Sequence, residues 1–129
     1  MKTKFPISVA VIAVLLAGCS SSPSANNLSV TEFSAKTAEA GVITIDVRTP
    51  GEFAEGYIEG ARLIDFQSGN FENEIATLDK NATYAVYCRS GNRSGQAVKV
   101  MKDAGFSNVF NMNGGVIEWA NAGLPLVRN

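Results

Sequence analysis

The fold is decided by residues 84–95, which read Tyr84-Ala85-Val86-Tyr87-Cys88-Arg89-Ser90-Gly91-Asn92-Arg93-Ser94-Gly95. The apolar and aromatic start of this stretch is typical of a buried strand, whereas Ser90-Gly91-Asn92 does not extend a strand easily. Residues 96–104 then carry apolar side chains at helical spacing. The stretch therefore predicts a strand, a short loop and a helix, with Cys88 at the point where the strand ends.

Cys88 is the candidate reactive group of this loop. The N–H groups at the start of a helix point into the preceding loop and favour an anion there, and a thiolate is such an anion. The alternative is that Cys88 is only a small hydrophobic residue at a strand end. Arg89, Gly91, Arg93 and Gly95 follow it at a spacing that would surround the sulfur with donors and positive charge, which favours a reactive thiolate.

The N-terminus carries a different signal. Lys2 and Lys4 precede an apolar run over residues 7–17, and Leu16-Ala17-Gly18-Cys19 follows, which resembles a bacterial lipoprotein signal. The run is shorter than the about 20 residues of a membrane-spanning helix. The alternative is an ordinary signal peptide that is cleaved at a different bond.

The resemblance implies that residues 1–18 are a removed signal and that Cys19 becomes the lipid-bearing first residue. Residues 19–28, rich in serine and asparagine, would then be a flexible tether. Ser20 after the cysteine is similar to signals that sort a protein to the outer membrane. We expect a lipid-anchored protein of the bacterial cell envelope that faces the periplasm.

Charge and composition exclude several functions. Removal of residues 1–18 takes away two lysines of the 11 basic residues, which leaves 9 basic against 12 acidic residues and a net charge of −3. No run of Lys or Arg exists to bind nucleic acid. The chain has no histidine, and lipidation of Cys19 leaves one thiol, so we expect no internal disulfide, no metal site and no cofactor.

The rest of the chain alternates between strand and helix signals. Capping boxes start at Ser29 and at Thr49, and these predict helices that end near Gly41 and Gly56. Further helices are predicted over 70–78, from the loop to about 105, and over 114–119; the predicted strands are 42–47, 61–65, 83–87 and 108–111. This order predicts one α/β domain over residues 29–129, with a central, mostly parallel sheet and helices on both faces. Sites in such sheets form at the carboxyl ends of the strands, where Cys88 lies.

Four segments in this order resemble a single-domain rhodanese, and the resemblance extends over residues 29–127. They are Asp46-Val47-Arg48-Thr49-Pro50-Gly51-Glu52-Phe53, Gly56-Tyr57-Ile58-Glu59-Gly60-Ala61, Cys88-Arg89-Ser90-Gly91-Asn92-Arg93-Ser94, and 105–125 with Gly114-Gly115 and Trp119. The resemblance implies a sulfurtransferase in which Cys88 takes sulfane sulfur from thiosulfate or a persulfide donor. The resulting persulfide passes the sulfur to cyanide or a thiol. The loop from Arg89 through Ser90, Gly91, Asn92 and Arg93 to Ser94 would bind the anionic donor.

Two positions depart from the family pattern. Tyr57 stands where a histidine is usual, and Leu63 stands where asparagine is common. Two other functions stay open: a phosphatase or arsenate reductase on the related fold, and a non-catalytic module that binds a partner in the pocket. Phosphatases with such a loop have five residues between cysteine and arginine, and this chain has four between Cys88 and Arg93.

Asp46 and Arg48 are candidate supporting residues of the site. They flank Val47 on a predicted strand, so both side chains lie on one face. We expect an ion pair that ties the strand end to the sheet; the alternative is that Asp46 orients groups of the loop.

Two further expectations concern the surroundings of the loop. Arg62 and Phe66 are candidates for the mouth of the site, and Trp119 is expected in the core with Ile117 and Leu124.

Overall fold

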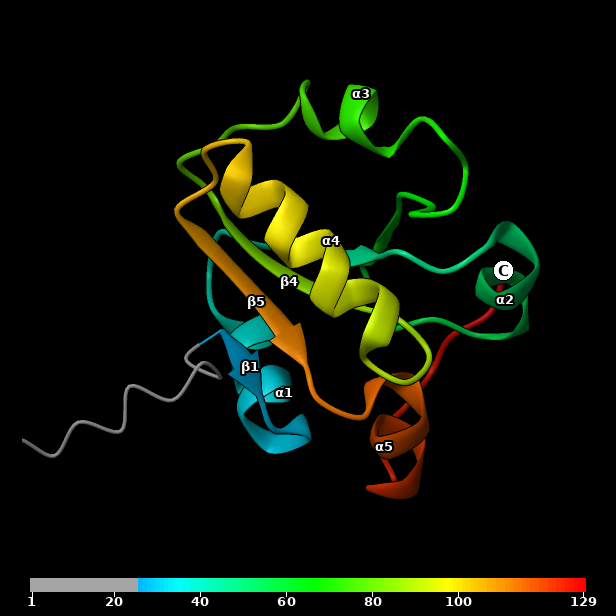
Figure 1. Ribbon diagram of the computed structural model, residues 1–129. Coiled ribbons are helices and arrows are strands. Elements are labelled where there is room, and N and C mark those ends of the chain that lie inside the picture. The colour runs from blue at the N-terminus through cyan, green and yellow to red at the C-terminus, as the bar shows by residue number, and fades with distance from the viewer. Residues whose placement is uncertain (1–25) are drawn as a thin grey trace, which may run out of the picture.

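The structure is a computed structural model that describes residues 26–129. These residues form one five-stranded sheet in which all neighbouring strands are parallel and the order is β1-β5-β4-β2-β3. Figure 1 shows β4 and β5 in the middle of the fold and β1 beside β5. The strands are β1 (Asn27–Leu28), β2 (Val42–Asp46), β3 (Arg62–Leu63), β4 (Thr83–Tyr87) and β5 (Asn108–Met112).

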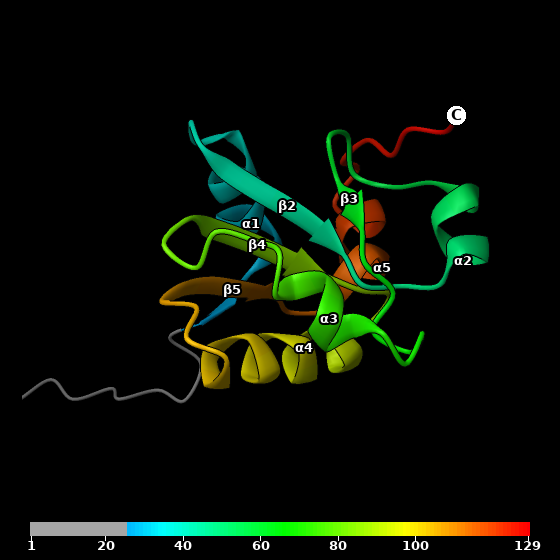
Figure 2. The same ribbon diagram turned by 90° about the horizontal axis from the view of Figure 1, so that it is seen from above.

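Helices cover both faces of the sheet, as predicted. On one face lie α3 (Phe71–Ile75) and α4 (Asn92–Asp103), and on the other lie α1 (Val30–Ala38) and α5 (Gly115–Asn121). Figure 2 shows the two layers on opposite sides of the sheet, with α2 (Pro50–Glu55) beyond the end toward which β2 points. The predicted single α/β domain is therefore confirmed.

Strand β4 divides the core between the two layers. Tyr84, Val86 and Cys88 belong to the hydrophobic cluster under α3 and α4, whereas Ala85 and Tyr87 belong to the cluster under α1 and α5. All five residues are fully buried. Successive side chains of a strand point to opposite faces, and a central parallel strand is covered on both, so the unbroken apolar run of the sequence is explained.

The capping boxes read from the sequence correctly predicted where α1 and α2 begin. Ser29 accepts a hydrogen bond from the Glu32 N–H while the Glu32 carboxylate accepts one from the Ser29 N–H, and Thr49 and Glu52 repeat this arrangement at the start of α2. Both predicted capping boxes are confirmed, because these contacts depend on residues three apart in the sequence.

Several element boundaries differ from the prediction. Helix α4 begins at Asn92, immediately after the loop, because Gly91 takes the left-handed backbone conformation that starts it. Strand β3 and helix α3 are shorter than the predicted 61–65 and 70–78. Asn27 and Leu28, assigned to the tether by the sequence, form an edge strand whose backbone pairs with Asn111 and Met112.

The predicted signal, Cys19 and most of the tether lie outside the described residues. Among the helices of residues 26–129, none combines the length and apolar character that crossing a membrane requires.

Candidate functional site

The sulfur of Cys88 lies at the buried end of the loop between β4 and α4. Cys88 is fully buried, and its Sγ accepts hydrogen bonds from the Gly91 N–H at 3.1 Å and from the Ser94 hydroxyl at 3.2 Å. Burial alone would raise the pKa of the thiol, but hydrogen bonds from the Ser94 hydroxyl and from the backbone N–H groups of Ser94, Gly91 and Ser90 outweigh it and lower the pKa. The loop thus favours the thiolate, largely through neutral donors.

Gly91 gives the loop its tight turn. Its φ of 98° lies in the left-handed region, which a residue with a side chain adopts only with strain. A Cβ at this position would also lie 3.1 Å from the carbonyl oxygen of Met112. The turn directs the Gly91 N–H back to the sulfur, so glycine is required here by both conformation and space.

The first turn of α5 donates two hydrogen bonds to the backbone of the cysteine loop. Val116 donates its N–H to the Cys88 carbonyl at 2.9 Å, and Ile117 donates to the Arg89 carbonyl at 3.2 Å. A Cβ at Gly115 would lie 2.3 Å from the Arg89 carbonyl oxygen, so only glycine permits this approach. Sequence reasoning identified Gly114-Gly115 as the start of a helix but not as a contact with the cysteine loop.

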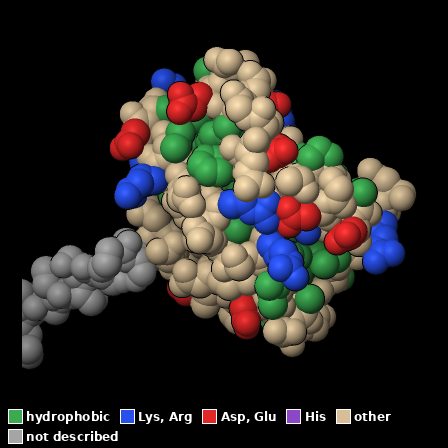
Figure 3. All heavy atoms as spheres, turned by 45° about the vertical axis from the view of Figure 1, so that its right-hand side comes forward, with side chains coloured by type: hydrophobic (Ala, Val, Ile, Leu, Met, Phe, Trp, Pro, Cys, Tyr) green, Lys and Arg blue, Asp and Glu red, His purple; other side chains and the backbone are tan. Residues whose placement is uncertain are grey.

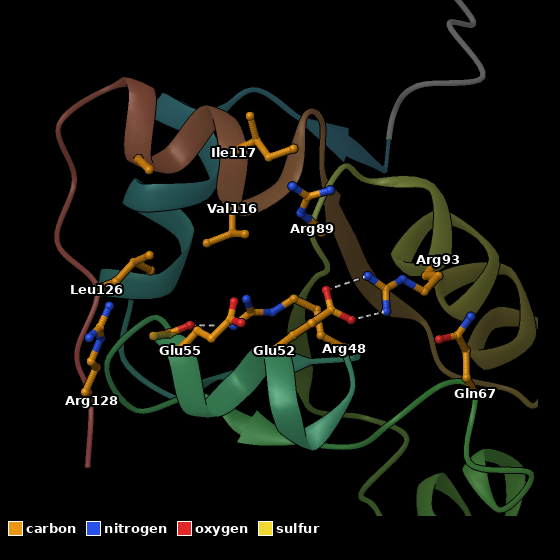
Figure 4. A pocket seen from close by; sticks show the side chains of 12 residues that line it. Arg48, Glu52, Glu55, Gln67, Arg89, Arg93, Val116, Ile117, Leu126 and Arg128 are labelled. Carbon is orange, nitrogen blue, oxygen red and sulfur yellow. Dashed lines mark hydrogen bonds and ion pairs between the residues drawn. The ribbon is translucent and has the colours of Figure 1, made fainter.

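A pocket of about 870 Å³ adjoins the loop. Figure 4 shows Val116, Ile117 and Leu126 on one side of it and Arg89 pointing into the same region. Figure 3 shows basic and acidic side chains lying together on this side of the molecule, next to hydrophobic ones. The pocket therefore combines a charged rim with an apolar wall, which suits a ligand with an anionic group.

Two expectations about the pocket were wrong. Arg62 and Phe66 are not among the lining residues, since Phe66 packs edge-on against Phe71 on the α3 side of the sheet. Ile117, expected in the core, is 39% exposed and lines the pocket, whereas Trp119 is buried and Leu124 packs beside it. On α5 the side chains two residues apart point in different directions, so Ile117 and Trp119 do not share a face.

Arg93 lines the pocket, but its guanidinium is already paired. It donates to both carboxylate oxygens of Glu52 at 2.7 and 2.9 Å (Figure 4). Two N–H groups of Arg93 therefore join α4 to α2, and these two are not free to bind an anion as the sequence predicts. Sequence reasoning identified Glu52 only as the partner of Thr49 in a helix cap.

Arg89 is the arginine of the cysteine loop that is available to a ligand, and Arg128 of the C-terminal segment also lines the pocket and is exposed. Arg89 is exposed, lines the pocket, and makes no ion pair with any carboxylate of residues 26–129. Ser90 and Asn92 are also exposed. The Asn92 side chain accepts a hydrogen bond from Gln96 within α4 at 2.8 Å, so it faces along the helix.

Asp46 and Arg48 form the expected ion pair. Arg48 Nη2 lies 2.6 Å from Asp46 Oδ2, and the same nitrogen donates to the Gly56 carbonyl at 2.6 Å. Both side chains are almost fully buried. Arg48 thus joins the end of β2 to the end of α2, and it supports the pocket rather than offering free charge to it.

Tyr57, at the position of the usual family histidine, holds the C-terminal segment. Its backbone pairs with Val127 through hydrogen bonds of 3.0 and 2.8 Å, and its ring stacks on Phe53 with centroids 4.0 Å apart. Leu126 and Arg128, on either side of Val127, line the pocket. Tyr57 therefore fixes one pocket wall. Leu63 lies in β3, where it pairs with Asp46.

Comparison with known proteins agrees with this geometry. The model of the rhodanese-like domain family matches residues 29–122. The chain is 37% identical over 86 residues to a "Sulfurtransferase" of Allochromatium vinosum, covering 67% of this chain and 78% of that protein. It is 38% identical over 81 residues to "Thiosulfate sulfurtransferase GlpE" of Pseudomonas aeruginosa, covering 63% and 72%.

A solved structure shares the fold as well. The rhodanese-like domain protein of Staphylococcus aureus superposes with a TM-score of 0.69 at 30% identity, covering 81% of this chain and 98% of that one.

The buried pair predicts a large effect on stability. In Asp46→Asn the Arg48 charge loses its partner while staying buried, and we expect the free energy of unfolding to fall by about 3–5 kcal/mol. Urea denaturation measures this change. The matched control is Glu39→Gln, which breaks the exposed pair with Lys36 and should cost less than about 1 kcal/mol. Equal losses in the two variants would contradict a special role of the buried pair.

The pair between Glu52 and Arg93 predicts a dependence of stability on pH. The hydrogen bond from Arg93 lowers the pKa of Glu52 from 4.5 to about 2. A carboxylate whose pKa is lower in the folded state stabilises the fold above its unfolded pKa, and this contribution is lost as pH falls through the folded value. Between pH 4.5 and 2, wild type should therefore lose stability more steeply than Glu52→Gln.

The control for this experiment is Glu55→Gln, which removes an exposed carboxylate from the same helix. Its urea midpoint should follow wild type over the acid range. If Glu52→Gln also followed wild type, the ion pair would not persist in solution.

Proposed function

Since this chain belongs to the rhodanese-like domain family, we propose that it transfers sulfane sulfur from thiosulfate or a persulfide donor to a thiophilic acceptor through a persulfide on Cys88. Relatives that are named sulfurtransferases support transfer of sulfur as the reaction class. The observation that carries the proposal is the environment of the Cys88 sulfur, which accepts hydrogen bonds from Gly91 and Ser94 in a loop whose Arg89 and Arg93 line the pocket.

The first half-reaction transfers sulfur from the donor to Cys88. The Cys88 thiolate attacks the outer sulfur of thiosulfate, a new bond forms between Sγ and that sulfur, and the S–S bond of the donor breaks. Sulfite leaves with the electron pair. The lowered pKa of the thiol supplies the nucleophile, and Arg89 at the pocket rim attracts the anionic donor.

The second half-reaction transfers the outer sulfur from Cys88 to the acceptor. A cyanide ion or an acceptor thiolate attacks the outer sulfur of the persulfide, the bond from that sulfur to Sγ breaks, and the electron pair returns to Sγ. The donors from Gly91 and Ser94 then stabilise Cys88 as a leaving thiolate. Both reactants enter as anions, so a chain without histidine needs no imidazole base for this chemistry.

The location is a second part of the proposal. The lipoprotein-like sequence Leu16-Ala17-Gly18-Cys19 supports a lipid anchor at Cys19, with the domain in the bacterial cell envelope facing the periplasm. The domain starts at Asn27, so a short segment would separate the lipid from the sheet.

Cys88→Ser tests the reaction. The hydroxyl of serine stays protonated where the thiol ionises, so we expect an intact fold by circular dichroism and no detectable sulfur transfer from thiosulfate to cyanide. Wild type incubated with thiosulfate should gain the mass of one sulfur atom on Cys88, and the variant should not. Hydrolysis of an aryl phosphate should be absent in both, because the loop has four residues between Cys88 and Arg93 and two N–H groups of Arg93 are bound to Glu52. Phosphatase turnover without sulfur transfer would contradict the proposal and favour the phosphatase alternative.

Cys19→Ala tests the location in a bacterial host. The variant should keep its sulfurtransferase activity, lack acyl groups by mass spectrometry, and move from the membrane fraction to the aqueous fraction. A non-acylated variant that stays in the membrane fraction would show that the anchor is a different one.

A further inference from the structure

The hydroxyl of Ser94 lies between two acceptors. Its oxygen is 3.2 Å from the Cys88 sulfur and 2.5 Å from Oδ1 of Asn111 on β5. All three residues are buried. A hydroxyl has one proton to donate, so Ser94 serves the sulfur or the amide oxygen, not both at full strength.

The orientation of the Asn111 amide is fixed by its other contacts. Its Nδ2 donates to the Asn27 side-chain oxygen at 2.9 Å and to the Gly91 carbonyl at 3.3 Å. A backbone carbonyl only accepts, so the nitrogen must face Gly91 and the oxygen must face Ser94. Asn111 is therefore held as an acceptor for the Ser94 proton.

We propose that Asn111 is a positioning residue that holds the Ser94 hydroxyl when the Cys88 sulfur is uncharged and releases it when that sulfur is a thiolate. This movement of the Ser94 hydroxyl between two acceptors rests on the proposed function, in which Cys88 alternates between a thiolate and a persulfide. In the thiolate, the charge on Sγ attracts the hydroxyl. In the persulfide, Sγ is a neutral sulfur and a weak acceptor, so the buried hydroxyl needs another partner, and Asn111 Oδ1 provides it.

This arrangement connects the N-terminal strand to the site. Asn27 in β1 accepts from Asn111, and the proton of the Ser94 hydroxyl goes either to Asn111 or to Cys88. The backbone of β1 is held in place as well, because Asn113 donates its N–H to the Leu28 carbonyl at 2.8 Å. Asn27 thus limits rotation of the Asn111 amide.

The charged groups around the loop make no hydrogen bond with the Asn111 side chain, whose partners are Ser94, Asn27 and Gly91. Arg93 on α4 is paired with Glu52 on α2, Arg48 is paired with Asp46 at the end of β2, and Arg89 is exposed. A change in thiol acidity on substitution of Asn111 would therefore report the hydroxyl and not an altered ion pair.

The decisive variants are Asn111→Leu and Ser94→Ala, and the readout is the rate of Cys88 alkylation by iodoacetamide as a function of pH. Without Oδ1, Ser94 donates to the sulfur alone, so the pKa of the thiol should fall. Alkylation on the acid side of the pKa should be about fivefold faster, as expected for one hydrogen bond. Ser94→Ala should shift the pKa upward. Simple disruption of the site would shift both variants upward.

Two further variants complete the test. Asn27→Ala frees the Asn111 amide without touching Ser94, and we expect a smaller shift in the direction of Asn111→Leu; it decides the matter if Asn111→Leu does not fold. Asn108→Leu, an exposed asparagine on the same strand, is the matched control and should leave the profile unchanged.

The persulfide gives a second readout. Asn111→Leu should carry a smaller persulfide fraction than wild type at equal thiosulfate and sulfite, by intact mass. An unchanged or raised thiol pKa in folded Asn111→Leu would overturn the inference. Failure of wild type to form a persulfide would overturn the proposed function instead, while the alkylation profiles would still test Asn111.

Discussion

The backbone of the cysteine loop is held by two hydrogen bonds from the first turn of α5, and the close approach of these two segments sets the position of the site. Val116 and Ile117 donate to the carbonyls of Cys88 and Arg89, and Gly115 leaves the space that this contact requires. The loop is thereby fixed at its carbonyl side by α5, while its N–H side is free to face the sulfur. A backbone held this way needs no rearrangement to receive a negative charge.

The ion pairs of the site mainly connect the strands and helices that surround the pocket. Arg48 joins β2 to the end of α2 through Asp46 and Gly56, and Arg93 joins α4 to α2 through Glu52. Neutral N–H and O–H groups stabilise the sulfur itself. This division would suit the proposed persulfide cycle, in which Sγ is a thiolate before it takes up sulfur and an uncharged bridging sulfur afterwards, because a permanent cation in contact with Sγ would favour the thiolate state.

The sequence was most informative where structure depends on neighbours in the chain. Strand β4 was predicted to the residue, since its apolar run is buried on both faces, and both helix caps followed from residues three apart. Contacts between distant residues were not predictable. The Arg93 pair with Glu52 joins residues 41 apart, and the Asn111 contact with Asn27 joins residues 84 apart. Strand β1 has two residues, too few for a periodic pattern, so it was assigned to the tether.

The shortness of the two edge strands affects how readily copies of this protein pair through their sheet edges. The sheet ends in β1 on one side and β3 on the other, and each has two residues. The long central strands are paired on both sides, so their backbone groups are already satisfied. A strand from another chain would find only a few free backbone partners at either border. The shortness of the two edge strands thus limits edge-to-edge aggregation, and the exposed charge of Arg62 in β3 acts in the same direction.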